Sequence, residues 1–173
     1  MEKSTTLSDK DPSPVEPYSL RIIMRNWTTG VAIVTSRWKD EQHGMTVSSF
    51  SSISLDPPLV SVSLAGDTRT HRLVSGSGIF GVTILADNQL EISDRFAGRI
   101  DDALDRFSGL NIFALTSGAP FLEGGLAYLD CRVASKLEAG HNTLFLGEVI
   151  ALKTGQNGAP LLYFDQHYQK ICE

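Results

Sequence analysis

Two segments in the first third of the chain combine hydroxyl side chains with small and β-branched residues. Residues 28–35 read T-T-G-V-A-I-V-T, and residues 44–52 read G-M-T-V-S-S-F-S-S. Small side chains let a flat ring lie against the backbone, while hydroxyls and backbone N–H groups can bind the polar edge of such a ring or a phosphate. The segments therefore indicate a ligand pocket built from strands, although serine and threonine are also common on solvent-exposed strands.

One arginine is a candidate phosphate ligand. Arg69 lies in the turn-like sequence T-R-T-H at residues 68–71. A guanidinium group presents a fork of N–H donors that matches phosphate oxygens, although an arginine in a turn is also often simply solvated. No Ser-His-Asp signature or H-E-x-x-H motif accompanies it, so the sequence indicates chemistry without a catalytic acid, base or metal.

A glycine motif at residues 76–81, G-S-G-I-F-G, matches the dinucleotide-binding pattern G-x-G-x-x-G. That pattern requires a strand before the glycines and a helix after them, because the helix N-terminus holds the pyrophosphate. Here a helix-like segment precedes the glycines and a β-branched strand begins inside the motif. The motif therefore predicts a glycine turn entering a strand rather than a Rossmann site.

Composition limits the classes of partner. The net charge is -5 and the pI is near 5.3, and no run of Lys or Arg is present, so a nucleic-acid surface is not expected.

The apolar runs are short and residues 1–17 are polar, which predicts a flexible N-terminal arm and a cytoplasmic protein without a membrane segment. Cys131 and Cys172 have no C-x-x-C spacing and are predicted to be reduced thiols.

The surrounding pattern predicts one mostly β domain over residues 18–173. Helical spacing predicts a helix over 18–27 with Ser19 as its cap, a short helix over 70–75, a helix over 87–96 with Asp87 as its cap, and a possible helical turn over 101–107. Period-two or buried-strand patterns predict roughly eight strands, over 31–35, 45–50, 59–64, 79–85, 125–137, 143–153, 160–164 and 168–171. Polar turns at 39–44 and 138–142 join two hairpins, which favours an antiparallel barrel over a doubly wound sheet.

Longer stretches of the chain resemble the short-chain flavin reductase family, the reductase components of two-component flavin monooxygenases. The resemblance covers residues 18–168 and rests on T-T-G-V-A-I-V-T, H-G-M-T-V-S-S-F-S-S-I-S-L-D-P-P-L-V, T-R-T-H, R-F-A-G, A-G-H-N-T-L-F-L-G-E-V and P-L-L-Y-F. It implies a homodimer with an FMN-binding split β-barrel fold, antiparallel and Greek-key-like, with two or three short helices. It also implies hydride transfer from NADH or NADPH to FMN or FAD, and release of the reduced flavin to a monooxygenase.

The resemblance also implies a flavin site. The residues it assigns to the ring, the ribityl chain and the phosphate are Thr29, Val31, Ala32, Ile33, Thr46, Val47, Ser48, Ser49, Ser63, Leu64, Ala65, Arg69, Thr70 and Phe96. Because hydride transfer depends on holding two rings about 3 to 3.5 Å apart, no catalytic side chain is expected.

The nicotinamide side of the implied site departs from the family pattern. The family often reads G-D-H before the T-L-F strand, whereas this chain reads G-H-N at residues 140–142. A shift of one residue on a strand reverses the side-chain face, although a turn can absorb it. His141 and Asn142 are therefore both candidates for the nicotinamide pocket, together with Tyr163 and Tyr168, whose aromatic faces could stack on the ring.

Two other functions fit the same residues. A split-barrel relative that holds FMN tightly could oxidise a different substrate, and a flavin-binding protein without turnover could act in storage or sensing. The altered G-H-N turn keeps the second of these alternatives open. The choices between FMN and FAD, and between NADH and NADPH, are also open.

Overall fold

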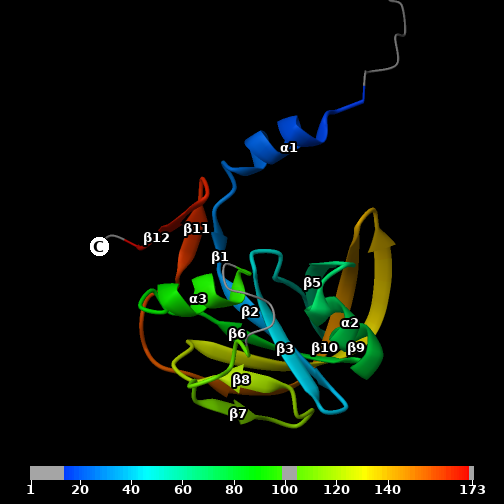
Figure 1. Ribbon diagram of the computed structural model, residues 1–173, viewed down its shortest axis with the longest axis vertical. Helices are drawn as coiled ribbons and strands as arrows, with labels where there is room; N and C mark the ends of the chain where they lie inside the picture. The colour runs from blue at the N-terminus through cyan, green and yellow to red at the C-terminus, as the bar shows by residue number, and fades with distance from the viewer. Residues whose placement is uncertain (1–13, 99–104, 172–173) are drawn as a thin grey trace, which may run out of the picture.

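The fold is mostly antiparallel β-structure with three short helices, as the resemblance implies. The computed structural model describes residues 14–98 and 105–171. The elements in chain order are α1 (Pro17–Met24), β1 (Thr29–Gly30), β2 (Ala32–Trp38), β3 (Glu41–Val47), β4 (Ser51–Leu55), β5 (Pro58–Ala65), α2 (Arg69–Ser77), β6 (Ile79–Ile84), α3 (Leu90–Phe96), β7 (Ile112–Ala114), β8 (Pro120–Leu122), β9 (Ala127–Ala139), β10 (Asn142–Thr154), β11 (Leu162–Phe164) and β12 (His167–Gln169) (Figure 1).

A seven-stranded sheet forms the body of the molecule, in the order β3-β2-β6-β9-β10-β5-β4. Strands β2 and β5 would lie roughly 19 Å apart if this sheet were flat. Their residues Ala32 and Val62 nevertheless belong to one buried core cluster, together with Phe80 and Phe145. The sheet therefore curls around this core. Among the described residues the end strands β3 and β4 do not pair, so the barrel is open.

Strand β2 is buried on both faces. Ala32 and Val34 face the core inside the curled sheet, while Val31, just before the strand, and Ile33 face a second core that contains Phe96 of α3. Successive side chains on a strand point to opposite faces, so this alternation places every residue of the early strand in one core or the other. Strand β2 thus lies between two packed cores.

Two smaller sheets complete the fold. Strand β1 pairs with β11, β11 pairs with β12, and β7 pairs with β8. The predicted set of roughly eight strands was short by β1, β4, β7 and β8. Strands β1, β7 and β8 have only two or three residues, and β4 lies in a serine-rich segment. No helix in residues 14–98 and 105–171 has the length and apolar character that a membrane span requires.

Several predicted boundaries were wrong. The β2–β3 turn contains only residues 39 and 40, because Lys39 adopts a left-handed φ of 56° and Glu41 already pairs with Trp38. The predicted caps Ser19 and Asp87 are replaced by Glu16 and Gln89, neither of which makes a side-chain cap bond. The predicted turn over 101–107 lies partly outside the described residues, as do Cys172 and most of the predicted arm.

The glycine motif has the predicted arrangement. Helix α2 runs up to Ser77, Gly78 ends it in the left-handed conformation with φ of 70°, and β6 begins at the next residue. The motif therefore runs from the end of a helix, through the turn at Gly78, into a strand, which is the reverse of the strand-to-helix order of a dinucleotide-binding turn. The prediction against a Rossmann site is confirmed by this order.

Candidate active site

Three adjoining cavities form a groove along β3. The serine cavity, of about 660 Å³, includes Thr29, Ser48 and Ser49 in its wall. The tyrosine cavity, of about 190 Å³, includes Val31, Tyr163 and Tyr168. The arginine cavity, of about 260 Å³, includes His43, Arg69 and Arg106. Ser48 and Tyr163 line both of the first two cavities, and Thr46 and Ala97 line both the second and the third. The groove is therefore continuous.

Most of the predicted site residues lie in this groove. Those that line it are Thr29, Val31, Thr46, Val47, Ser48, Ser49, Arg69, Thr70, Phe96, Tyr163 and Tyr168. They come from β1, the β2–β3 hairpin and the residues next to it, the start of α2, the end of α3 and the β11–β12 hairpin. The fold thus brings together segments more than 100 residues apart in the sequence.

Three of the predicted site residues pack in the protein interior. Ala32, Ile33 and Leu64 are 3%, 0% and 0% exposed and belong to the two cores. These side chains line none of the three cavities, so their part in a ligand site stays a prediction. Both faces of β2 are covered, and a sequence pattern of small and β-branched residues does not distinguish this from a ligand wall.

A hydrogen-bonded chain joins the serine cavity to the long β9–β10 hairpin. The Ser49 hydroxyl donates to the Ser63 carbonyl at 2.9 Å and accepts from the Ser63 backbone N–H at 3.2 Å. Asn142 Nδ2 donates to the Ser63 hydroxyl at 3.2 Å. The predicted residues Ser49, Ser63 and Asn142 are thus brought together, while Ala65 is the pairing partner of Asn142 on β5.

His141 lies apart from this chain of bonds. It is exposed in the turn between β9 and β10, and its carbonyl accepts from the Gly66 N–H at 2.9 Å. Of these two residues, Asn142 is therefore the one whose side chain bonds to Ser63.

Contacts between hydroxyl groups hold the β11–β12 hairpin, which carries the two tyrosines of the tyrosine cavity. The Thr46 hydroxyl donates to the Ser93 carbonyl at 2.6 Å, and the Ser93 hydroxyl lies 2.8 Å from the Tyr168 hydroxyl. The rings of Tyr163 and Tyr168 are 5.4 Å apart at an angle of 63°. These contacts hold the β11–β12 hairpin against β3 and α3, and they position two aromatic faces beside the middle of the groove.

The arginine cavity contains two side chains that sequence reasoning missed. His43 is buried, and its Nδ1 lies 2.8 Å from the Thr70 hydroxyl. Arg106 is also buried, and its Nη1 donates to the carbonyls of Gly44 at 3.1 Å and Phe96 at 3.0 Å. His43 was missed because the turn was predicted over 39–44, whereas the structure places His43 on β3. Arg106 comes from an irregular turn and gave no sequence signal.

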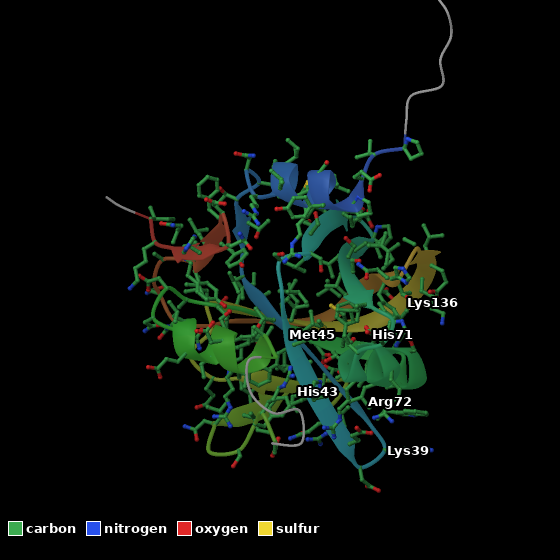
Figure 2. All side chains as sticks on the ribbon, turned by 45° about the horizontal axis from the view of Figure 1, so that its top comes forward. Lys39, His43, Met45, His71, Arg72 and Lys136 are labelled. Atoms are coloured by element: carbon green, nitrogen blue, oxygen red, sulfur yellow. The ribbon has the colours of Figure 1, made fainter. Side chains whose placement is uncertain are left out.

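Arg69 is held by an ion pair. Its Nε lies 2.5 Å from Glu41 Oε1, and Arg72 Nη2 lies 2.6 Å from the same oxygen. The hydrogen bond from Arg69, followed by the charges of Arg69, Arg72 and His43, outweighs the opposing effect of burial and lowers the pKa of the Glu41 carboxyl. The carboxylate therefore stays ionised and orients both guanidinium groups. Figure 2 shows Met45, His43 and Arg72 following one another toward the β2–β3 turn.

The groove combines the tyrosine cavity, with its aromatic and apolar side chains, the hydroxyls of the serine cavity, and the arginine cavity. This composition suits a flat heteroaromatic ring that carries a phosphate, since hydroxyls bind the ring edge and guanidinium groups bind the phosphate. Thr29 Oγ1, in the wall of the serine cavity, is buried and has no hydrogen-bond partner within the described residues. A buried hydroxyl of this kind is expected to bind a partner outside the protein chain.

The sequence pattern described as "Flavin reductase like domain" matches residues 24–172. The chain belongs to this family. An NADH-dependent flavin reductase from Rhodococcus sp is 36% identical over 169 residues, which cover 96% of this chain and 92% of the relative. The reductase component of 4-hydroxyphenylacetate 3-monooxygenase from Thermus thermophilus is 31% identical and covers 86% of this chain and 92% of its own length.

Solved structures of the flavin reductase family share the fold. The Streptomyces globisporus NADH:FAD oxidoreductase, solved in complex with NAD and FAD fragments, has a TM-score of 0.83 and 31% identity, covering 90% of this chain and 92% of that structure. The flavin reductase PheA2 also has a TM-score of 0.83 and 31% identity, covering 92% of this chain and 100% of its own. The predicted family and fold class are confirmed by these matches.

Proposed function

We propose that this chain is an NAD(P)H-dependent flavin reductase, which transfers a hydride from NADH or NADPH to FMN or FAD and supplies the reduced flavin to a partner monooxygenase. The observation that carries the proposal is the continuous groove along β3, with hydroxyls at one end and arginines at the other. The groove belongs to a chain whose relatives include NADH-dependent flavin reductases and the reductase component of a monooxygenase.

The residues of the groove have distinct roles in this proposal. Thr29, Thr46 and Ser48 bind the polar edge and chain of the flavin, and Arg69 with Thr70 binds its phosphate. When bound, the flavin accepts the hydride that the reduced nicotinamide donates. Tyr163 and Tyr168 exclude water from the ring and border the nicotinamide, with Asn142 at the rim of the same region. No side chain has to move a proton, because orientation of the two rings supplies the catalysis.

Oxidation of NADH titrated with free FMN and FAD tests the proposal. We expect the rate to rise with added flavin and to saturate, because the flavin enters and leaves as a substrate. A protein that holds FMN tightly and oxidises another compound would be insensitive to added flavin. A flavin-binding protein without turnover would become yellow and bleach with dithionite, yet would not oxidise NADH.

We also propose that the protein is a homodimer and works in the cytoplasm. Helix α1 has no buried residue, and Figure 1 shows it standing away from the barrel. Its side chains Leu20, Ile23 and Met24 are 56%, 65% and 51% exposed. A helix of eight residues is marginal by itself in water, and an exposed apolar face of this kind marks an interaction site. A second copy of the chain would cover that face. The proposal that the protein works in the cytoplasm is tested separately, by cell fractionation.

A further inference from the structure

The turn between β11 and β12 holds two residues in an unfavourable backbone conformation. Phe164 pairs with His167, so the turn consists of Asp165 and Gln166 alone. Their φ values are 44° and 65°, both in the left-handed region. Glycine suits such a position, and asparagine and aspartate tolerate it, whereas a longer side chain such as that of Gln166 is strained there. A contact elsewhere in the fold is therefore needed to stabilise Gln166 in this turn.

Arg25, which ends helix α1, provides that contact. With the amide oxygen of Gln166 facing Arg25, the three guanidinium nitrogens lie 2.9 to 3.1 Å from that oxygen. The Arg25 carbonyl also accepts from the Asp165 backbone N–H at 3.1 Å. Arg25 is half-buried, whereas every residue of α1 is exposed. We call these two contacts the Arg25 clasp, since they join the end of α1 to the tip of the β11–β12 hairpin.

The clasp lies close in sequence to the two tyrosines of the groove. Tyr163 is two residues before Asp165, and Tyr168 is two residues after Gln166. The tyrosines pair across the hairpin, on strands of only three residues each. Figure 1 shows this hairpin in red beside the blue segment that follows α1. A hairpin this short has little stability of its own, so the position of its tip affects both rings.

The rest of the hairpin is anchored by separate contacts. At its base, the Val31 N–H donates to the Leu161 carbonyl and the Leu161 N–H donates to the Leu85 carbonyl, both at 3.0 Å. On β12, the Tyr168 hydroxyl lies 2.8 Å from the Ser93 hydroxyl. These contacts fix the base and one strand of the hairpin, but not its tip.

One further bond at the tip is internal to the hairpin. His167 Nδ1 lies 2.6 Å from the Asp165 carbonyl, and since a carbonyl only accepts, Nδ1 is the donor. This bond shapes the turn without fixing its place relative to the barrel. The Arg25 clasp therefore determines where the tip lies.

We propose that Gln166 is a positioning residue for hydride transfer, which acts by binding Arg25 and thereby holds Tyr163 and Tyr168 against the nicotinamide. The inference rests on the proposed function, which places the nicotinamide beside these tyrosines. Hydride transfer needs the two rings within a narrow range of distance and orientation, so a small displacement of the aromatic wall lowers the rate. A glycine at position 166 would relieve the strain and release the tip. Stability and activity are therefore opposed at this position.

Gln166→Gly tests the proposal, because it relieves the strained φ and removes the side-chain contact with Arg25. We expect kcat/KM for the reduced nicotinamide to fall about threefold to tenfold, the effect of one lost hydrogen bond. The midpoint of urea unfolding should be no lower than that of the wild type, since relief of strain offsets the lost contact. A residue with a purely structural role would lose activity and stability together.

Three further variants provide a rescue, a control and a test of the contact itself. Gln166→Glu keeps an oxygen acceptor at the same reach and should retain the wild-type kcat/KM. Gln169→Ala changes an exposed glutamine on β12 and should match the wild type. Arg25→Ala should reduce kcat/KM as much as Gln166→Gly does, and the double variant no further, because both substitutions break the same contact.

Four results would overturn the inference. The first is a wild-type kcat/KM in Gln166→Gly, and the second is a parallel fall in its stability. The third is a double variant in which the two losses multiply, since each side chain would then bind the ligand separately. The fourth is an equal loss of affinity for FMN or FAD in calorimetry, which would assign the clasp to the flavin rather than to the nicotinamide.

Hydrogen exchange separates this inference from the proposed function, because it needs no turnover. In Gln166→Gly, the amides of residues 162–169 should exchange several-fold faster than in the wild type, with Gln166→Glu unchanged. If exchange responds in this way but the wild type oxidises neither NADH nor NADPH with added flavin, the proposed function fails while the clasp still holds the tip. If the wild type reduces flavin and exchange over 162–169 is the same in Gln166→Gly, the inference fails.

Discussion

Ser48 and Ser49 are adjacent in the sequence and have different surroundings. Ser48 is exposed and lines both the serine and the tyrosine cavities. Ser49 is half-buried, and its hydroxyl makes two bonds with the backbone of Ser63. Ser48 is thus a candidate ligand-binding residue, whereas Ser49 ties the loop after β3 to β5 and acts by positioning.

Removal of the two hydroxyls should have separable effects. We expect Ser48→Ala to weaken flavin affinity by about threefold to tenfold, the effect of one lost hydrogen bond, with little change in stability. Ser49→Ala should lower both the affinity and the midpoint of urea unfolding, because the loop loses its anchor. Flavin affinity by calorimetry and urea unfolding measure the two effects. The exposed Ser135→Ala on β9 is the control, and wild-type affinity in both variants would remove these serines from the site.

Cys131 illustrates a buried group with no role in the proposed chemistry. Burial, followed by the neighbouring Asp130 charge, raises the pKa of its thiol to about 12, and the residue is fully buried in the barrel core. Because the thiolate is the reactive form, this thiol should be inert near neutral pH.

The reactivity of Cys131 can be measured in a Cys172→Ser variant. We expect an aromatic disulfide reagent to label the native protein at pH 8 very slowly, and to label the protein rapidly in urea after unfolding. Labelling of the native protein at the rate of a free thiol would show that the thiol is exposed by frequent local opening.

Among the elements, α2 has the clearest capping. The Thr68 hydroxyl accepts from the His71 backbone N–H at 3.3 Å and donates to the Ala65 carbonyl at 2.8 Å. At the other end, Gly78 is left-handed and its N–H binds the Val74 carbonyl at 2.9 Å. The helix carries Arg69, so its cap also positions the phosphate end of the groove.

Loss of the Thr68 cap should reduce stability and flavin binding together. We expect Thr68→Ala to lower the free energy of unfolding by about 1 kcal/mol and to raise the KM for the flavin. Thr68→Ser keeps the hydroxyl and should remain close to the wild type. Urea unfolding and steady-state kinetics provide the two measurements. Equal stabilities of the alanine and serine variants would show that the cap bond contributes nothing.

At the scale of the whole molecule, the detached helix α1 is the main feature that one chain leaves unexplained. Its apolar side chains are exposed, and further exposed apolar residues lie on β4, where Ile53 and Leu55 are 53% and 91% exposed. The serine cavity also includes Arg21 and Met24 of α1. Dimer formation would therefore cover this helix and reinforce one end of the groove.

Charges on the apolar face of α1 should separate the dimer. We expect the wild type to have the mass of two chains in multi-angle light scattering, and a Leu20→Glu, Ile23→Glu double variant to have the mass of one chain with weaker flavin binding. Ser19→Glu, at an exposed polar position of the same helix, should stay dimeric. A monomeric wild type, or a double variant that remains dimeric, contradicts the proposed homodimer.

The sequence by itself determined the family, the antiparallel class and the first hairpin. The existence of this hairpin was predicted, but its register, with Ile33 opposite Thr46, was not, because the predicted turn over 39–44 contains only residues 39 and 40 in the structure. Helix α2 and the strand after it were readable because the glycine turn lies between them. These features depend on local patterns and short connections, which a sequence displays directly.

Only the tertiary structure decided which side chains share the groove. The unbroken apolar run over residues 31–34 predicts a buried strand, but it does not specify that Ile33 packs against Phe96 in the second core rather than against a ligand. Arg106 reaches Gly44 across 62 positions, and Asn142 reaches Ser63 across 79. Such contacts depend on the curling of the sheet and the packing of its layers, and no local spacing of residues specifies them.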